Sequence, residues 1–332
     1  MRTNPMRLRV LVALLGAAAA VWSPGVQAQT PAVPVIGFLN SASPGPAAPL
    51  LAAFHRALQR SGFVEGRNVA IQYRWAEGHY DRLRGLADDL VNRKVALIAA
   101  TGGLVTGQAA KAATSTTPVL FIAGFDPVRE GLASSINRPG GNATGVGVYT
   151  TELGRKRLEL LRELLPAVDK IAMLVNPYSI STAVERRDLE DGARLAGLQL
   201  FVVQASTEDE LEPAFRRAVD GGAGALIVSA DALFTSRRTQ ITALAARHAL
   251  PASYPWPQYA DAGGLMSYGP SLTWAYEQIG EYAGRILKGA KPEDLPVQLP
   301  TTFELVINLK AAKSLDLAIP PFLLARAHRV VE

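Results

Sequence analysis

The sequence predicts an α/β protein with two lobes, each built on a mostly parallel sheet that helices cover on both faces. Short apolar runs, such as VPVIGFL (33–39) and VALIAA (95–100), alternate with amphipathic segments of helical period. Apolar strands without polar alternation are typical of parallel sheets buried on both faces. We expect about ten strands, which exceeds what one doubly wound sheet usually holds at this length. Two sheets are therefore predicted, separated by the turn-rich segment RPGGNATGVGVYTTE (138–152).

The first half of the chain predicts strands and helices in alternation. The runs 33–39, 95–100 and 119–123 are short enough for strands and end in turn-forming residues. Apolar and polar positions alternate in residues 69–75, which is the period of a half-exposed strand. Two intervening helices are predicted from apolar residues three or four positions apart, namely Leu50, Leu51, Phe54 and Leu58, and then Leu83, Leu86 and Leu90.

The second half repeats this order. Strands are predicted at 170–175, 199–203 and 225–228, and a short one reaches Tyr254. The stripe Leu158, Leu161 and Leu165 predicts a helix before the first of these strands. The segment PASYPWPQYADAGGLMSYGP (251–270) gathers four aromatic residues, and its prolines and glycines exclude an ordinary helix or strand through all of it.

The N-terminus is expected to be an export signal that is not part of the fold. Arg2, Arg7 and Arg9 precede an apolar run over residues 10–22, and small residues follow up to Ala28. The run is shorter than the stretch of about 20 residues that a membrane-spanning helix needs. The arrangement is typical of a secretory signal peptide, residues 1–28, cleaved after about Ala28. An uncleaved anchor is the alternative.

The composition argues against several classes of site and partner. The chain has no cysteine, which excludes disulfides and thiolate sites, and its four histidines are scattered. Without the three arginines of the signal, the formal charge falls from +5 to +2, which argues against a nucleic-acid partner. The segment GGLVTGQA (102–109) has the spacing of a phosphate loop but lacks its lysine. We therefore predict no catalytic residues, no metal and no cofactor.

Polar residues, glycine and proline follow the ends of six predicted strands. Ligands bind at this carboxyl edge of open parallel sheets, so two facing lobes would line one cleft with these loops. Ordinary βα turns also need such residues, and Asp126 and Asp231 can equally cap the next helix. The candidate ligand-binding residues from these loops are Asn40, Ser41, Thr101, Gly102, Gly103, Phe125, Asp126, Asn176, Asp231 and Tyr254.

Four segments of the sequence carry a family resemblance. They are VIGFLNS (35–41), FIAGFDPVREGLASSINRPGGNATGV (121–146), ALPASYPWPQYADAGGLMSYGP (249–270) and FELVINLKAAKSLDLAIP (303–320). With them the chain resembles the ABC-transporter substrate-binding protein family that includes tryptophan- and tyrosine-binding members. The similarity spans about residues 30–322.

The resemblance implies a type I periplasmic binding protein fold, with two Rossmann-like, doubly wound parallel-sheet lobes joined by a three-crossover hinge. The crossovers are expected near 147–151, 255–260 and 297–301. The N-lobe would comprise 30–148 plus 259–298, with residues 265–267 as its returning strand, and the C-lobe 149–258 plus 299–332. The segment 251–270 would then cross the hinge at Pro255-Trp256-Pro257, with aromatic residues beside the cleft. Packing of the crossover strands is the alternative explanation for these aromatics.

The resemblance also implies a function, that of a periplasmic solute-binding protein of an ABC importer. Such a protein closes its lobes on a small ligand and delivers it to a membrane permease with a cytoplasmic ATPase. We expect an exported monomer that is not embedded in the membrane and does not bind nucleic acid. An exported ligand-sensing or hydrolytic α/β protein acting on a small carboxylate or amide is the alternative.

An amino acid, especially an aromatic one, is the first choice of ligand. Its carboxylate would meet Ser41, Thr101 and the amides of Gly102 and Gly103, and Asp126 or Asp231 would bind its ammonium. The apolar part would lie against an aromatic side chain. No arginine directly follows a cleft-edge strand, and Arg129 is the nearest one. The aromatic candidates are Phe125, Tyr178, Tyr254 and Tyr268.

Overall fold

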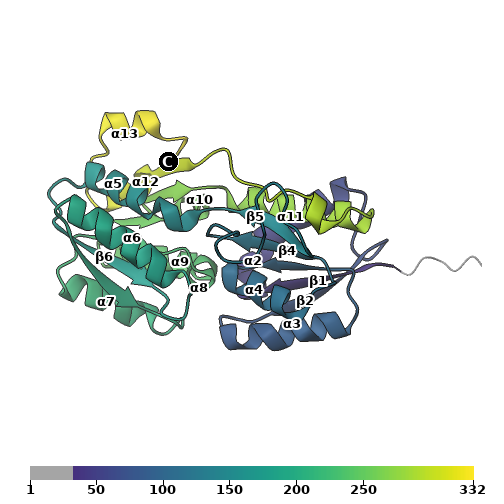
Figure 1. The fold of residues 1–332 in the computed structure, drawn as a ribbon. Coiled ribbons are helices and arrows are strands. Elements are labelled where there is room, and N and C mark those ends of the chain that lie inside the picture. Colours follow the sequence, from purple (N-terminus) through teal and green to yellow (C-terminus); the bar gives the residue numbers. More distant parts are fainter. Residues whose placement is uncertain (1–32) are drawn as a thin grey trace, which may run out of the picture. The chain divides into compact units, whose positions relative to one another are not determined.

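The computed structural model describes residues 33–332, which form two lobes (Figure 1). The predicted signal peptide lies outside the described residues. The predicted two-sheet α/β architecture is confirmed, with a five-stranded sheet in the first lobe and a seven-stranded sheet in the second. No helix in the described part of the chain is long and apolar enough to cross a membrane.

The first sheet is parallel throughout, in the order β2-β1-β3-β4-β5. Its strands are β1 (Val35–Asn40), β2 (Ala70–Trp75), β3 (Leu97–Thr101), β4 (Val119–Ala123) and β5 (Ala143–Gly147). The helices of this lobe are α2 (Pro44–Arg60), η1 (Tyr80–Arg82), α3 (Leu83–Asn92), α4 (Leu104–Ala113), α11 (Leu272–Leu287) and η3 (Pro292–Asp294).

Helices cover both faces of the first sheet, which explains its continuous apolar strands. In β3, Leu97 and Ala99 belong to the core shared with α2 and α11, whereas Ile98 and Ala100 belong to the core shared with α3 and α4. The helices α2 and α11 approach closely at Gly280, where a Cβ atom would lie 2.3 Å from the Phe54 carbonyl oxygen. This close packing fixes α11, a late segment of the chain, on the first sheet (Figure 1).

The second sheet has the order β12-β11-β10-β9-β8-β6-β7, and only the β10–β11 pairing is antiparallel among the described strands. Its strands are β6 (Lys170–Val175), β7 (Gln199–Gln204), β8 (Ala225–Val228), β9 (Ala252–Tyr254), β10 (Met266–Gly269), β11 (Glu304–Asn308) and β12 (Arg329–Val331). The helices of this lobe are η2 (Thr150–Leu153), α5 (Gly154–Leu164), α6 (Thr182–Leu195), α7 (Leu211–Asp220), α8 (Ala232–Ser236), α9 (Arg238–Arg247), α10 (Pro257–Asp261), α12 (Leu309–Ser314) and α13 (Pro321–Arg326).

The placement of residues 265–267 in the first lobe is wrong, because β10 lies in the second sheet. Met266 pairs with Ser253 of β9 and with Ile307 of β11. The predicted crossover near 255–260 is also wrong, because Pro257 begins α10, which packs within the second lobe. The chain returns to the first lobe only after Gly269, and α11 begins there at Leu272.

This arrangement explains the aromatic segment. Tyr254 and Tyr259 are fully buried in the second lobe, and their rings stack with centroids 4.6 Å apart. Stacked, offset rings of this kind contribute packing energy beyond the area they bury. Two of the aromatics of 251–270 are therefore core residues, and Trp256 is the one that lines the cavity between the lobes.

Candidate ligand-binding cleft

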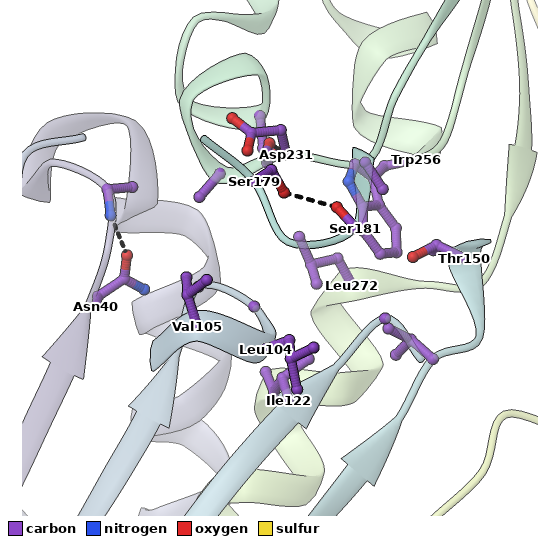
Figure 2. A pocket seen from close by; sticks show the side chains of 18 of the residues that line it. Asn40, Leu104, Val105, Ile122, Thr150, Ser179, Ser181, Asp231, Trp256 and Leu272 are labelled. Atoms are coloured by element: carbon purple, nitrogen blue, oxygen red, sulfur yellow. Dashed lines mark hydrogen bonds between the residues drawn. The ribbon is translucent and has the colours of Figure 1, made fainter. Parts of the chain in front are cut away.

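Residues of both lobes line one cavity, which encloses about 910 Å³ when the part open to solvent is counted. Figure 2 shows Asn40, Leu104 and Ile122 on one side and Ser179, Ser181 and Asp231 on the other. These residues lie in or just after strand ends or at helix starts, as expected for a site at the carboxyl edges of two parallel sheets.

A hydrogen-bond network holds the first-lobe loops at the cavity. The Asn40 side-chain amide donates to Thr101 Oγ1 at 2.8 Å and to the Tyr276 hydroxyl at 3.0 Å. Its Oδ1 accepts from the Ala42 N–H at 2.7 Å (Figure 2). Both Asn40 and Thr101 are almost completely buried. This network ties β1, β3 and α11 together beneath the cavity.

Gly102 is needed for the shape of this wall. Its φ of +98° lies in the left-handed region that favours glycine. A Cβ atom there would lie 2.6 Å from Ser41 Oγ and 2.8 Å from the Ser41 backbone nitrogen. Ser41 Oγ in turn donates to the Gly102 carbonyl at 2.7 Å. The two loops after β1 and β3 therefore touch, and α4 begins directly beyond them.

Apart from Tyr80 and Tyr276, the rest of the first-lobe wall is apolar. Its side chains come from the start of α2, the start of α4, the end of β4 and the start of α11. Figure 2 shows four of them around the same space. Such a surface suits a hydrocarbon or aromatic part of a ligand. The apolar residues include Leu50, Leu104, Val105, Ile122, Phe125 and Leu272.

The second-lobe wall is more polar. Ser179 and Ser181 share a hydrogen bond of 2.6 Å between their Oγ atoms (Figure 2). The loop that carries them is held by Asn176, whose carbonyl accepts from Thr182 Oγ1 at 2.5 Å. Trp256 also lines this side and is 6% exposed, and its Nε1 has no hydrogen-bond partner among the described residues.

Asp231 bridges the two lobes. The Tyr80 hydroxyl of the first lobe donates to its Oδ2 at 2.6 Å. Its Oδ1 accepts from Asn176 Nδ2 at 3.3 Å and from the Leu233 N–H at 2.9 Å, which caps α8. Burial raises the pKa of Asp231, although these hydrogen bonds favour the ionised form. Burial likewise raises the pKa of Tyr80 well above its usual value, so its hydroxyl remains a donor.

Glu185 is the second carboxyl group at the cavity, and the sequence reasoning missed it. It lies on α6, is 2% exposed, and accepts one hydrogen bond of 3.4 Å, from the Ala230 N–H to Oε2. Its Oε1 is buried without a partner among the described residues. Burial raises the pKa of Glu185 to about 7, against the opposing effect of the buried Arg157 guanidinium.

The structure divides the twelve predicted site residues into three groups. Asn40, Gly102, Gly103, Phe125 and Asp231 line the cavity. Three others are buried and support the lining loops through hydrogen bonds without lining the cavity, namely Ser41, Thr101 and Asn176. The remaining four residues lie outside the cavity lining, and they are Asp126, Tyr178, Tyr254 and Tyr268.

Each of these four side chains lies in surroundings other than the cavity. Asp126 Oδ1 accepts from the Val128 N–H at 2.9 Å, so its carboxylate stabilises its own turn. Tyr178 is 74% exposed. Tyr254 stacks on Tyr259 in the core. Tyr268 is partly buried, and its ring stacks on Phe303 with centroids 6.4 Å apart.

Five of the lining residues that the prediction did not include show why it was incomplete. Tyr80, Ser179, Ser181 and Trp256 follow or precede strands at short distance, so a wider window around each strand end could have found them. Glu185 lies within a helix rich in charged residues, and nothing in its sequence position separates it from exposed neighbours. Among residues 33–332, no cluster of histidine and acidic side chains has the geometry of a metal site.

A family model described as ABC transporter substrate binding protein matches residues 48–331. The chain belongs to this family. Similar to this substrate-binding protein is the tyrosine-binding protein of Clostridioides difficile (strain R20291). The two are 28% identical over 264 residues, which is 80% of this chain and 75% of the relative.

Solved structures of similar fold extend over most of this substrate-binding protein. A conserved domain protein from Vibrio cholerae is 24% identical, with a TM-score of 0.80, and covers 90% of this chain and 99% of its own. An ABC domain in complex with L-Trp from Streptococcus pneumonia is also 24% identical, with a TM-score of 0.79 and the same coverage. Solute-binding proteins with bound myo-inositol or 5-methylthioribose have the fold as well. The protein thus has the type I periplasmic binding protein fold.

Proposed function

We propose that this protein is the exported solute-binding component of an ABC importer. It would bind a small ligand in the cleft between its lobes and deliver it to a membrane permease. The family assignment supports this role, and the signal-like residues 1–28 support export to the periplasm. The cleft itself supports ligand binding, because buried polar groups and apolar side chains from both lobes line one cavity.

The ligand we propose is an amino acid with an aromatic or other large apolar side chain. The observation that carries this choice is the division of the cleft into an apolar wall and a wall with buried carboxyl groups. The apolar wall would receive the side chain, and the polar wall would bind the charged end. The tyrosine-binding relative and the neighbour solved with L-Trp are consistent with this ligand class.

Binding without turnover is the activity that we propose. The hydroxyls of Ser179 and Ser181 hydrogen-bond to each other, and no histidine is among the described residues that line the cavity. A serine nucleophile needs a neighbouring base to take its proton. Among the described residues, neither hydroxyl is hydrogen-bonded to a histidine or a carboxylate, and such a pair of serines supports a binding role over a hydrolytic one.

The test is a binding screen of the mature protein from residue 29 onward. Thermal unfolding would be followed with and without each of the twenty amino acids, small organic acids and small amides, and positives would be titrated by calorimetry. A ligand at 100 times its Kd stabilises the folded state by about 2.7 kcal/mol, which raises the melting temperature measurably. We expect aromatic amino acids to bind with micromolar Kd, or about −8 kcal/mol.

Two other results would overturn parts of this proposal. Chemical conversion of a bound amide or ester would favour the hydrolytic alternative over transport. A melting temperature that responds to no member of the panel would contradict the proposed ligand class.

A further inference from the structure

We infer that Glu185 binds a positively charged nitrogen of the ligand, and that this nitrogen, more than a carboxylate, is the group the cleft requires. The inference rests on the proposed binding function and goes further by naming the recognised group and the residue that binds it. It departs from the sequence-based hypothesis, in which Asp126 or Asp231 had this role.

The charges at the cavity favour a cation. Of the described residues that line it, two are acidic, Glu185 and Asp231, and none is lysine, arginine or histidine. A ligand carboxylate would therefore meet only uncharged donors there, namely hydroxyls, backbone amides and the side-chain N–H groups of Asn40 and Trp256. A cationic nitrogen would meet one or two carboxylates in a setting largely removed from water, where charge-assisted hydrogen bonds are strongest.

Asp231 is already engaged. Both of its oxygens accept hydrogen bonds, Oδ2 from the Tyr80 hydroxyl and Oδ1 from Asn176 Nδ2 and the Leu233 N–H. These bonds join the lobes and cap α8. A ligand nitrogen that took over this carboxylate would have to displace part of that network.

Glu185 has the free acceptor. Its Oε1 has no hydrogen-bond partner among residues 33–332, although the side chain is 2% exposed and lines the cavity. A buried carboxylate that lacks a partner is costly in its ionised form. A ligand cation would supply the missing partner and favour ionisation, which agrees with a pKa that burial has raised to about 7.

The groups facing Glu185 define the competing explanation. Arg157 of α5 is fully buried nearby, and Asp188 of α6 and Asp231 also act on Glu185 electrostatically. Asp188 already pairs with Arg155 at 2.6 Å. Within residues 33–332, Arg157 Nε, like Glu185 Oε1, has no hydrogen-bond partner, so neither atom bonds to the other. If Glu185 serves only to balance the charge of Arg157, its removal should affect folding and not ligand choice.

The first experiment uses the wild-type protein and three compounds that differ in one group each. L-tyrosine carries both charges, tyramine lacks the carboxylate, and 3-(4-hydroxyphenyl)propanoate lacks the ammonium. Loss of a charge-assisted hydrogen bond in a buried site lowers affinity by roughly tenfold or more. We expect tyramine to retain more affinity than the deaminated acid. Equal or tighter binding of the deaminated acid would overturn the inference.

The second experiment compares Glu185→Gln with Glu190→Gln. Both lie on α6, but Glu190 is exposed and pairs with Arg186. We expect Glu185→Gln to weaken L-tyrosine and tyramine by roughly tenfold or more and to leave the deaminated acid nearly unchanged. Glu190→Gln should bind all three as the wild type does. Equal weakening of all three compounds by Glu185→Gln, or of none, would identify Glu185 as a structural partner of Arg157.

Proton linkage gives a readout that needs no variant. If a ligand cation requires ionised Glu185, wild-type affinity should rise with pH between 5 and about 7 and then level off. Calorimetry in two buffers of different ionisation enthalpy should detect proton release over the same range. A flat pH profile would contradict the inference.

The compound series also separates this inference from the proposed ligand class. The same three-way comparison would be made with isoleucine and its decarboxylated and deaminated counterparts. Binding of the aliphatic amines alone, weakened by Glu185→Gln, would support Glu185 and exclude the aromatic preference. Binding of neutral or anionic compounds alone would refute the role of Glu185 while leaving a solute-binding function in place.

Discussion

The two walls of the cleft differ in how they are built. The first-lobe wall is apolar and rests on Gly102 and on a buried network of uncharged groups around Asn40. The second-lobe wall carries both carboxyl groups at the cavity, Glu185 and Asp231, and each has a pKa that burial raises. The contrast indicates that the first-lobe wall determines the shape of the site and that the second-lobe wall supplies its charge.

Substitutions in the two walls should therefore affect stability and binding through different physical effects. A change in the first wall should act through sterics and be insensitive to pH. A change in the second wall should act through charge and vary with pH. Matched pairs of variants test that distinction.

The largest effect is expected at Gly102. Gly102→Ala adds a Cβ atom 2.6 Å from Ser41 Oγ at a φ of +98°, so it combines backbone strain with a clash. We expect a loss of roughly 2–5 kcal/mol in the free energy of unfolding, and strongly reduced ligand binding. Urea denaturation at two pH values would measure the loss, which should be the same at both.

Gly66→Ala is the matched control for Gly102→Ala. Gly66 has a φ of +78°, but a Cβ atom there has no neighbour within 4 Å. Only the backbone cost of about 1–2 kcal/mol should remain. Equal losses in the two variants would show that the contact between the loops after β1 and β3 contributes nothing to the first wall.

A smaller effect with a pH signature is expected at Glu185 in the unliganded protein. The folded-state pKa of about 7 exceeds the ordinary value of 4.5, so the folded protein binds more protons than the unfolded chain between these values. Wild-type stability should therefore fall as pH rises through this range. In Glu185→Gln this carboxyl group is absent, so stability should not fall in this way. Above pH 7 the variant should be more stable than the wild type by at most about 3 kcal/mol, and near pH 4 the two should differ little.

Urea denaturation at pH 4.5, 6 and 8 would measure this difference. A variant that is less stable than the wild type at pH 8 would mean that ionised Glu185 and Arg157 form a net stabilising pair. The charge of Glu185 would then serve to stabilise the fold and not to bind a ligand.

The difference between the walls also explains what the sequence could predict. The loops after β1 and β3 were predicted to line the site because Asn40, Gly102 and Gly103 follow apolar strands, and a strand end is a local signal. Glu185 could not be found this way, because its burial depends on how α6 packs beside the β8–α8 loop. Asp231 was found for its place after β8, but its partner Tyr80 lies 151 residues away in sequence.

The prediction that the aromatic segment 251–270 crosses to the first lobe was wrong for a related reason. Its prolines and glycines were correctly interpreted as interruptions, since α10 is only five residues long. Whether the chain then crossed to the other lobe depended on the pairing of Met266 with Ser253 and Ile307. Pairing partners are set by the whole sheet, so a family pattern and local composition were insufficient to place this strand.

A moderate effect is expected at Tyr80, whose hydroxyl connects the walls. Tyr80→Phe removes the 2.6 Å hydrogen bond to Asp231 but keeps the ring. Because this bond forms only while the lobes are together, its loss should weaken ligand affinity by about tenfold, or about 1.4 kcal/mol. Calorimetric titration would measure the change.

Tyr73→Phe controls for the loss of a tyrosine hydroxyl. The Tyr73 hydroxyl contacts His55 and Glu65 within the first lobe and does not line the cavity. Ligand affinity should stay at the wild-type value in this variant. If the two variants bind alike, the contact between Tyr80 and Asp231 has no part in closure on the ligand.

The smallest effect is expected at Asp126, the acid that the sequence favoured in the first wall. Its Oδ1 accepts from the Val128 N–H at 2.9 Å, and Asn can keep that bond through its own carbonyl oxygen. Asp126→Asn should therefore change stability by under about 1 kcal/mol and ligand affinity by less than about twofold. Calorimetry on this variant beside Asp231→Asn would compare the acids of the two walls directly. If Asp126→Asn abolished binding, the first-lobe wall would also bind the ligand through a charge. That result would contradict the proposed difference between the two walls.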